Sequence, residues 1–130
     1  MADYLFASGA MGLSIAIIAG LSHFTIMANL HKAVAGRLDA QSGKWRLPLF
    51  FIGHLAFALI FAYLLRLVWP AEVPLAGGAL FGALVGMAIY IPLLFSQFAM
   101  FHYPAALVIG GALIGIFQTA VAGLIGGLIL

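Results

Sequence analysis

The chain has 130 residues, of which 66% are hydrophobic and 6% are charged, and its formal net charge is +2. A soluble domain carries about 25% charged residues because it must present a wetted surface. The composition therefore excludes a soluble globular protein and predicts one whose solvent is lipid. The chain has no cysteine, which excludes a disulfide, a thiolate ligand and a thiol nucleophile.

The N-terminal segment differs from a cleavable signal peptide. Its first residues, MADYLF, include an acid, Asp3, where a signal peptide carries basic residues. The apolar run that follows is also too long for the hydrophobic region of a signal peptide. We therefore expect this run to be retained as a transmembrane helix.

Four segments are long and apolar enough to cross a membrane, since about 20 mostly apolar residues span roughly 30 Å of hydrocarbon. The predicted spans cover about residues 4–30, 47–69, 75–100 and 103–130. Pro48, Pro74 and Pro104 fall at helix starts, where the missing N–H costs nothing. Pro92 lies inside the third span, where it predicts a bend.

The one hydrophilic stretch, residues 31–46, lies between the first two spans and reads HKAVAGRLDAQSGKWR. Four of the five basic residues of the chain lie in it, namely Lys32, Arg37, Lys44 and Arg46. Because basic loops stay on the cytoplasmic side, these residues anchor the topology and predict that both termini lie on the non-cytoplasmic side. We interpret the positive charge as this topology signal and expect no nucleic-acid partner.

The later spans are joined by short links. PAEVP joins the second span to the third, and one or two residues join the third to the fourth. Short links make antiparallel neighbours. We therefore predict a single all-α domain over residues 1–130, a four-helix transmembrane bundle in the bacterial cytoplasmic (inner) membrane.

Glycines recur at four-residue spacing in the third and fourth spans. They are Gly78, Gly82 and Gly86, then Gly111 with Gly115, and Gly123 with Gly127. Small residues four apart allow close approach of another helix, and van der Waals contact drives helix association in lipid. We expect packing within the bundle, and contact with a second subunit is the alternative.

Two histidines are predicted to lie within the membrane. Counted from the ends of the spans, His23 and His54 are each seven residues, or roughly 10 Å, from the cytoplasmic boundary, whereas His31 and His102 lie at the interface. Neutral imidazole inside a bundle can ligate haem iron, bind another metal or relay protons. We therefore single out His23 and His54 as candidate cofactor ligands, with haem b as the first cofactor to test.

A simpler role for these histidines is to hold helices together through hydrogen bonds to Ser22, Ser96 or Gln97. Helices packed about 8–10 Å apart also leave too little room for a haem between facing histidines. A bis-histidine haem would therefore need ligands on non-adjacent helices or on different subunits. Gln118, near the middle of the fourth span, is expected to pair with a carbonyl or hydroxyl on a neighbouring helix.

Catalytic and transport signals are weak. The sequence has no paired carboxylates, HExxH, GxSxG or phosphate-binding glycine loop, so we do not expect an enzyme. No Asp or Glu lies inside a predicted span, which counts against ion-coupled transport.

The small size and small extramembrane mass of the chain favour a structural or accessory subunit of a larger membrane complex, or a homo-oligomer. Its expected partners are the lipid bilayer and other subunits. The first alternative is a redox protein that binds haem b or another cofactor through the intramembrane histidines. The second is a small transporter or channel.

Overall fold

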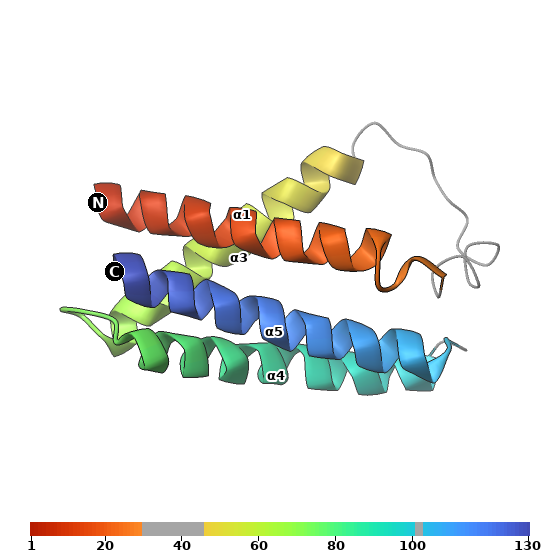
Figure 1. Cartoon of the computed structure of the whole chain (residues 1–130). Helices are drawn as coiled ribbons and strands as arrows, with labels where there is room; N and C mark the ends of the chain where they lie inside the picture. Colours follow the sequence, from red (N-terminus) through yellow and green to blue (C-terminus); the bar gives the residue numbers. More distant parts are fainter. Residues whose placement is uncertain (30–45, 101–102) are drawn as a thin grey trace.

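A computed structural model describes residues 1–29, 46–100 and 103–130 (Figure 1). The described residues form four long helices and no strand; the helices are α1 (Ala2–Phe24), α3 (Arg46–Val68), α4 (Leu75–Met100) and α5 (Ala105–Ile129). Each is long and apolar enough to cross a membrane. This confirms the prediction of an all-helical chain with four apolar helices of membrane-spanning length.

Most helix boundaries fall within two residues of the predicted ones, but α1 ends at Phe24 instead of near Leu30. Leu21 O accepts hydrogen bonds from both the backbone N–H and the side-chain hydroxyl of Thr25, at 2.9 and 2.6 Å. The next turn is wider, because Met27 N donates to Ser22 O at 2.9 Å. Local side-chain bonding of this kind competes with regular helix, so α1 stops although the sequence stays apolar.

Consecutive helices run in opposite directions, and both termini lie at the same end of the molecule (Figure 1). α4 packs most extensively on α5, and α1 packs against both α3 and α5. Whereas α1, α4 and α5 lie side by side, α3 crosses them obliquely (Figure 1). The molecule is therefore a closely packed α4–α5 pair joined, through α1, to an inclined α3.

Glycine lines the contact between α4 and α5. A Cβ added at any of five glycines would run into the facing helix; at Gly127, for example, it would lie 2.7 Å from Leu75 Cα. The five are Gly78, Gly82, Gly86, Gly123 and Gly127. The two backbones meet directly at these positions, which is the geometry that small residues permit in lipid.

Small residues also bring α3 close to α1. A Cβ added at Gly12 of α1 would lie 3.4 Å from Ala58 Cβ and 3.4 Å from Leu55 Cα. The Tyr4 hydroxyl donates to Leu59 O at 2.5 Å and ties the same two helices together. The main core fills the space between the helices and includes Ala7, Met11, Ile15, Ala58, Phe61, Ala62, Leu65, Val73, Ala122 and Leu130.

α3 and α4 pack as neighbours only near the link between them. There the ring of Phe61 stacks on Phe81 and the Trp69 ring meets Phe81 edge-on, each pair with centroids 5.9 Å apart. These large rings hold the helices apart, and α3 and α4 diverge with distance from the link (Figure 1). The expectation that a short link makes packed neighbours therefore holds for α4 and α5, where glycines face each other, and only partly for α3 and α4.

The residues that predict the membrane topology fall largely outside the described part of the chain. Lys32, Arg37 and Lys44 lie there, as do His31 and His102. Arg46 is the first residue of α3.

Candidate functional site

Three adjoining cavities lie between α3 and α1 on one side and α4 and α5 on the other. The apolar cavity measures about 330 Å³ and is lined by residues that include Ile15, Leu49, Phe57 and Ile89. The polar cavity measures about 170 Å³ and is lined by residues that include Ser22, His23, His54, Tyr90 and Gln118. The side cavity, about 210 Å³, is lined by residues that include His23, Tyr90, Leu93 and Gln97.

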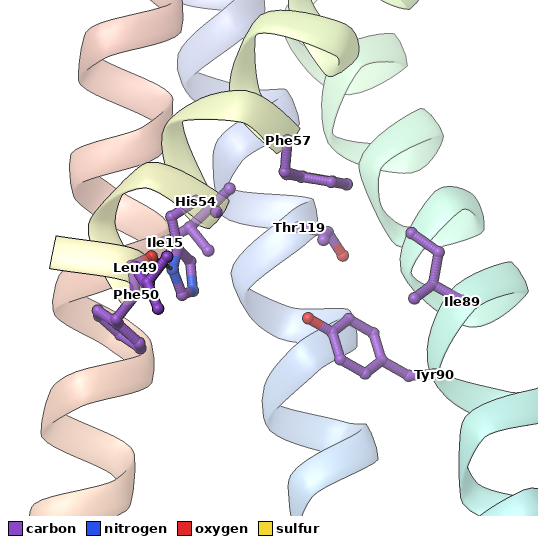
Figure 2. A pocket seen from close by; sticks show the side chains of 9 residues that line it. Ile15, Leu49, Phe50, His54, Phe57, Ile89, Tyr90 and Thr119 are labelled. Carbon is purple, nitrogen blue, oxygen red and sulfur yellow. Dashed lines mark hydrogen bonds between the residues drawn. The ribbon is translucent and has the colours of Figure 1, made fainter. Parts of the chain in front are cut away.

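The three cavities share lining residues. Phe50, His54 and Tyr90 line both the apolar and the polar cavity. His23 and Tyr90 line both the polar and the side cavity. Figure 2 shows the apolar cavity, where Phe57 and His54 of α3 face Ile89 and Tyr90 of α4 and Thr119 of α5 lies between them. The cavities follow from the fold, because α3 and α4 diverge beyond their aromatic contact.

His54 is held in one tautomer by its own helix. Its Nδ1 lies 2.6 Å from Phe50 O, and a carbonyl oxygen only accepts hydrogen bonds, so Nδ1 carries the proton. In the neutral ring, Nε2 then has a lone pair and accepts hydrogen bonds. Within the described part of the chain, the Phe50 carbonyl is the one hydrogen-bond partner of the imidazole. Nε2 is therefore available to a donor or a metal, the arrangement that protein metal ligands also use.

His23 lies closer to the end of its helix than predicted. The predicted depth was counted from Leu30, but α1 ends at Phe24, so His23 lies in the last turn of the helix. His54 lies eight residues after the start of α3, and the two are not level by residue count. The oblique path of α3 (Figure 1) nevertheless brings both imidazoles to the wall of the polar cavity.

Tyr90 and Gln118 form the polar contact between α4 and α5. Gln118 Nε2 donates to the Tyr90 hydroxyl at 2.8 Å, which confirms the expectation that Gln118 pairs with a hydroxyl or carbonyl on a neighbouring helix. The side chain of Gln118 is 5% exposed, and its Oε1 is buried with no hydrogen-bond partner among the residues that the structure describes. Tyr90, for its part, accepts from Gln118 and keeps its own O–H to donate.

Two glycines of α5 shape this region. A Cβ added at Gly115 would lie 2.5 Å from the Tyr90 ring, so glycine at this position allows the ring to lie against α5. Gly111 lines both the polar and the side cavity, and a Cβ added there would meet only the end of Met27, at 4.0 Å. Both glycines were predicted to pack helices together. In the structure both border the polar cavity, and only Gly115 lies against the facing helix.

Sequence reasoning did not predict the pairing of Tyr90 with Gln118, or the cavity beside it. A signal was nevertheless present, because Gly115 and Gln118 are three residues apart and so share one face of a helix. A polar residue beside a glycine on a membrane helix indicates a face on which a bulky polar partner fits.

The dimensions of the polar cavity restrict what the two histidines hold. An engineered protein cavity of about 150 Å³ accommodates one benzene ring, so about 170 Å³ matches a single six-membered ring. A porphyrin is several times larger, and this volume favours a single ring over a haem between His23 and His54. The described residues also contain no group of three or more His, Cys, Asp or Glu side chains that would hold a metal ion.

Comparison with known proteins finds no match among family models, curated proteins or solved structures.

Proposed function

We propose that the chain is an integral membrane protein that holds a small lipid-soluble molecule between its helices, in the polar cavity. One observation carries the proposal: polar side chains from all four helices line one cavity of about 170 Å³, namely Ser22 and His23 of α1, His54 of α3, Tyr90 of α4 and Gln118 of α5. The hydrocarbon of a membrane supplies no water to hydrogen-bond with such groups, and an unsatisfied polar group costs about 1–3 kcal/mol. A bound molecule with a polar group would supply hydrogen bonds there.

The hydrogen bonding of His54 and Tyr90 supports the same proposal. These residues come from two helices that diverge, both line the polar cavity, and each keeps one hydrogen-bonding group beyond the bonds described above. The adjoining apolar cavity would accept the hydrophobic remainder of the ligand. Ligand sites in proteins share this composition, a mostly apolar wall with a few polar groups.

The proposed function can be tested by filling the polar cavity. Gly111→Leu adds a side chain at its wall, and Gly9→Leu adds the same side chain on α1 where a Cβ would meet nothing within 4 Å. Native mass spectrometry of protein released from its membrane should show a bound small molecule on the wild type and on Gly9→Leu, and none on Gly111→Leu. Identical bound molecules on all three proteins would contradict the proposal.

We further propose that the four helices span the bacterial cytoplasmic membrane with residues 31–46 in the cytoplasm and both termini outside. The four basic residues of that loop support this orientation. Because the chain has no cysteine, single cysteines placed at Lys44 and at Glu72 report on opposite sides. A membrane-impermeant thiol reagent applied outside intact cells should label the cysteine at 72 and spare the one at 44, and the reverse pattern would overturn the orientation.

The roles of accessory subunit, homo-oligomer, haem protein and small transporter stay predictions. The glycine stripes no longer favour a second subunit in particular, because five of those glycines lie against the facing helix of the α4–α5 pair. The size of the polar cavity favours a small ligand over haem. Both observations support binding of a single-ring molecule ahead of the other roles.

A further inference from the structure

We infer that the apolar cavity opens sideways into the hydrocarbon of the bilayer, and that the ligand is a single-chain amphiphile whose chain leaves through this opening. The inference rests on the proposed function, because it specifies the class of the ligand and its route into the polar cavity. Three observations support it: the exposure of the residues that line the apolar cavity, their depth along the helices, and the position of its polar side chains.

The apolar cavity reaches from the core of the molecule to its surface. At its inner end lie Ile15 of α1 and Thr119 of α5, which are 2% and 1% exposed. Its mouth is formed by Leu49 and Gly53 of α3 and Ile89 of α4, all of them exposed. Leu49 is 63% exposed and Ile89 is 43% exposed. The mouth therefore lies between α3 and α4, on the outer surface of the bundle.

The depth of the apolar cavity determines what the mouth faces. One lining residue lies near the midpoint of each of the four helices: Ile15, Phe57, Ile89 and Thr119. With the four helices across the bilayer, their midpoints lie in its hydrocarbon core, where no water is present. The molecules that can enter through the mouth are therefore hydrocarbon chains, and a chain that fills the cavity gains dispersion contacts that a void lacks.

The polar side chains of the apolar cavity lie where it adjoins the polar one. They are His54, Tyr90 and Thr119. The Thr119 hydroxyl is bonded within its own helix, to Gly115 O at 3.0 Å and Ile116 O at 2.9 Å. His54 and Tyr90 also line the polar cavity, and Figure 2 shows the Tyr90 hydroxyl directed toward α3, the helix of His54. A chain in the apolar cavity would thus join a head group in the polar cavity between these two side chains.

The volume of the apolar cavity fits one chain. A cavity of about 150 Å³ holds the six carbon atoms of benzene, so about 330 Å³ holds roughly a dozen carbon atoms. Because the mouth is open, a longer chain continues from it into the lipid, and the cavity sets no upper limit on chain length. The chain is surrounded by hydrocarbon both in the cavity and in the bilayer, so it gains little hydrophobic free energy by binding. The cavity therefore gives the chain a route, and the polar cavity holds the head group.

The inference can be tested with ring probes that differ only in their chain, added to the full-length protein in lipid nanodiscs. The probes are para-cresol, para-dodecylphenol and para-octadecylphenol, and their concentrations are expressed per lipid so that partitioning into the bilayer does not enter the comparison. Binding is measured as the concentration of probe that gives half of the maximal rise in the midpoint of thermal unfolding, because a ligand that binds the folded state stabilises it.

Two variants narrow the mouth, and each has a matched control. Gly53→Leu is compared with Gly9→Leu, because both glycines are exposed and a Cβ at either meets nothing within 4 Å. Ile89→Trp is compared with Leu80→Trp, which changes an exposed residue of α4 that lines none of the three cavities. Gly111→Leu fills the polar cavity and tests the proposed function.

The long-chain probes should bind Gly53→Leu and Ile89→Trp at least about ten-fold more weakly than the wild type, because a chain forced past an added side chain overpacks the site. The two controls should bind them as the wild type does. Para-cresol, which has no chain to place, should bind all of these proteins equally. Para-octadecylphenol should bind the wild type as tightly as para-dodecylphenol, and Gly111→Leu should bind none of the probes.

Three results would overturn the inference and leave the proposed function standing. The first is binding of para-dodecylphenol to Gly53→Leu and Ile89→Trp as to the wild type, which would mean that the chain does not leave through the mouth. The second is loss of binding when the chain is lengthened to octadecyl, which would indicate an enclosed pocket. The third is a wild-type dimer that Ile89→Trp separates in native mass spectrometry, which would mean that a second copy of the chain covers the mouth.

A different result would overturn the proposed function and the inference together. If none of the three probes stabilises the wild type, or if Gly111→Leu binds them as the wild type does, the polar cavity holds no head group.

Discussion

Replacing Gly82 by alanine should force α4 and α5 apart and destabilise the pair. A Cβ at this position would lie 2.9 Å from the carbonyl carbon of Thr119 and 3.0 Å from Ala120 Cα. The Thr119 carbonyl oxygen would lie closer still. Because non-bonded heavy atoms attract best at about 3.5–4.0 Å, the helices would have to separate by roughly 1 Å. A gap of that size forfeits about a quarter to a half of the attraction between facing atoms, and overpacking of this kind costs about 1–3 kcal/mol.

Gly9→Ala is the matched control, since a Cβ there meets nothing within 4 Å. Both variants exchange glycine for alanine within a long helix, so the change in helix propensity is the same in each. The measurement is the midpoint of thermal unfolding in mild detergent, followed by near-ultraviolet circular dichroism of the aromatic residues. Gly82→Ala should unfold at a lower temperature than the wild type and than Gly9→Ala. Equal midpoints for the two variants would refute the direct backbone contact described here.

Three further outcomes follow from other contacts. Gly115→Ala should displace the Tyr90 ring, because the added Cβ would lie 2.5 Å from it; a changed near-ultraviolet tyrosine signal would show this, and an unchanged one would contradict it. His54→Leu removes one hydrogen bond within α3 and should cost no more than about 1 kcal/mol of stability while weakening ring binding; a large loss of stability would instead indicate helix packing. Arg66→Ala removes a bond to Ala71 O of 2.7 Å and should lower stability by about 1 kcal/mol, measured by thermal unfolding; no change would mean that solvent replaces the bond.

The helices themselves could be predicted from hydropathy and proline placement. The third predicted span coincides with α4, and Pro74 and Pro104 directly precede α4 and α5. The end of α1 could not be predicted in this way. It depends on the bond from the Thr25 hydroxyl to Leu21 O, whereas hydropathy measures only the apolar character that continues past this point.

The candidate site was predicted in part. His23 and His54 were singled out, and both line the polar cavity, although the depth argument that paired them used a helix end that the structure places six residues earlier. The contribution of Tyr90 depends on the register between α4 and α5, which the spacing of glycines along each helix does not determine. The divergence of α3 from α4 depends on three aromatic rings that meet only after folding.

The contact of Phe61, Phe81 and Trp69 is also a point about which α3 can tilt relative to α4. These rings fix α3 against α4 near the link between the helices, and the fifteen residues from Arg46 to Ile60 form an arm that extends away from this contact. At about 1.5 Å per residue that arm is roughly 22 Å long, so a tilt of about 5° at the rings moves its far end by roughly 2 Å. His54 lies about midway along the arm and would move by roughly half as much. Any such tilt also has to shift the contacts of α3 with Gly12 and Tyr4 of α1, so ring packing and these contacts together set the distance between the imidazole on one wall and Tyr90 on the other.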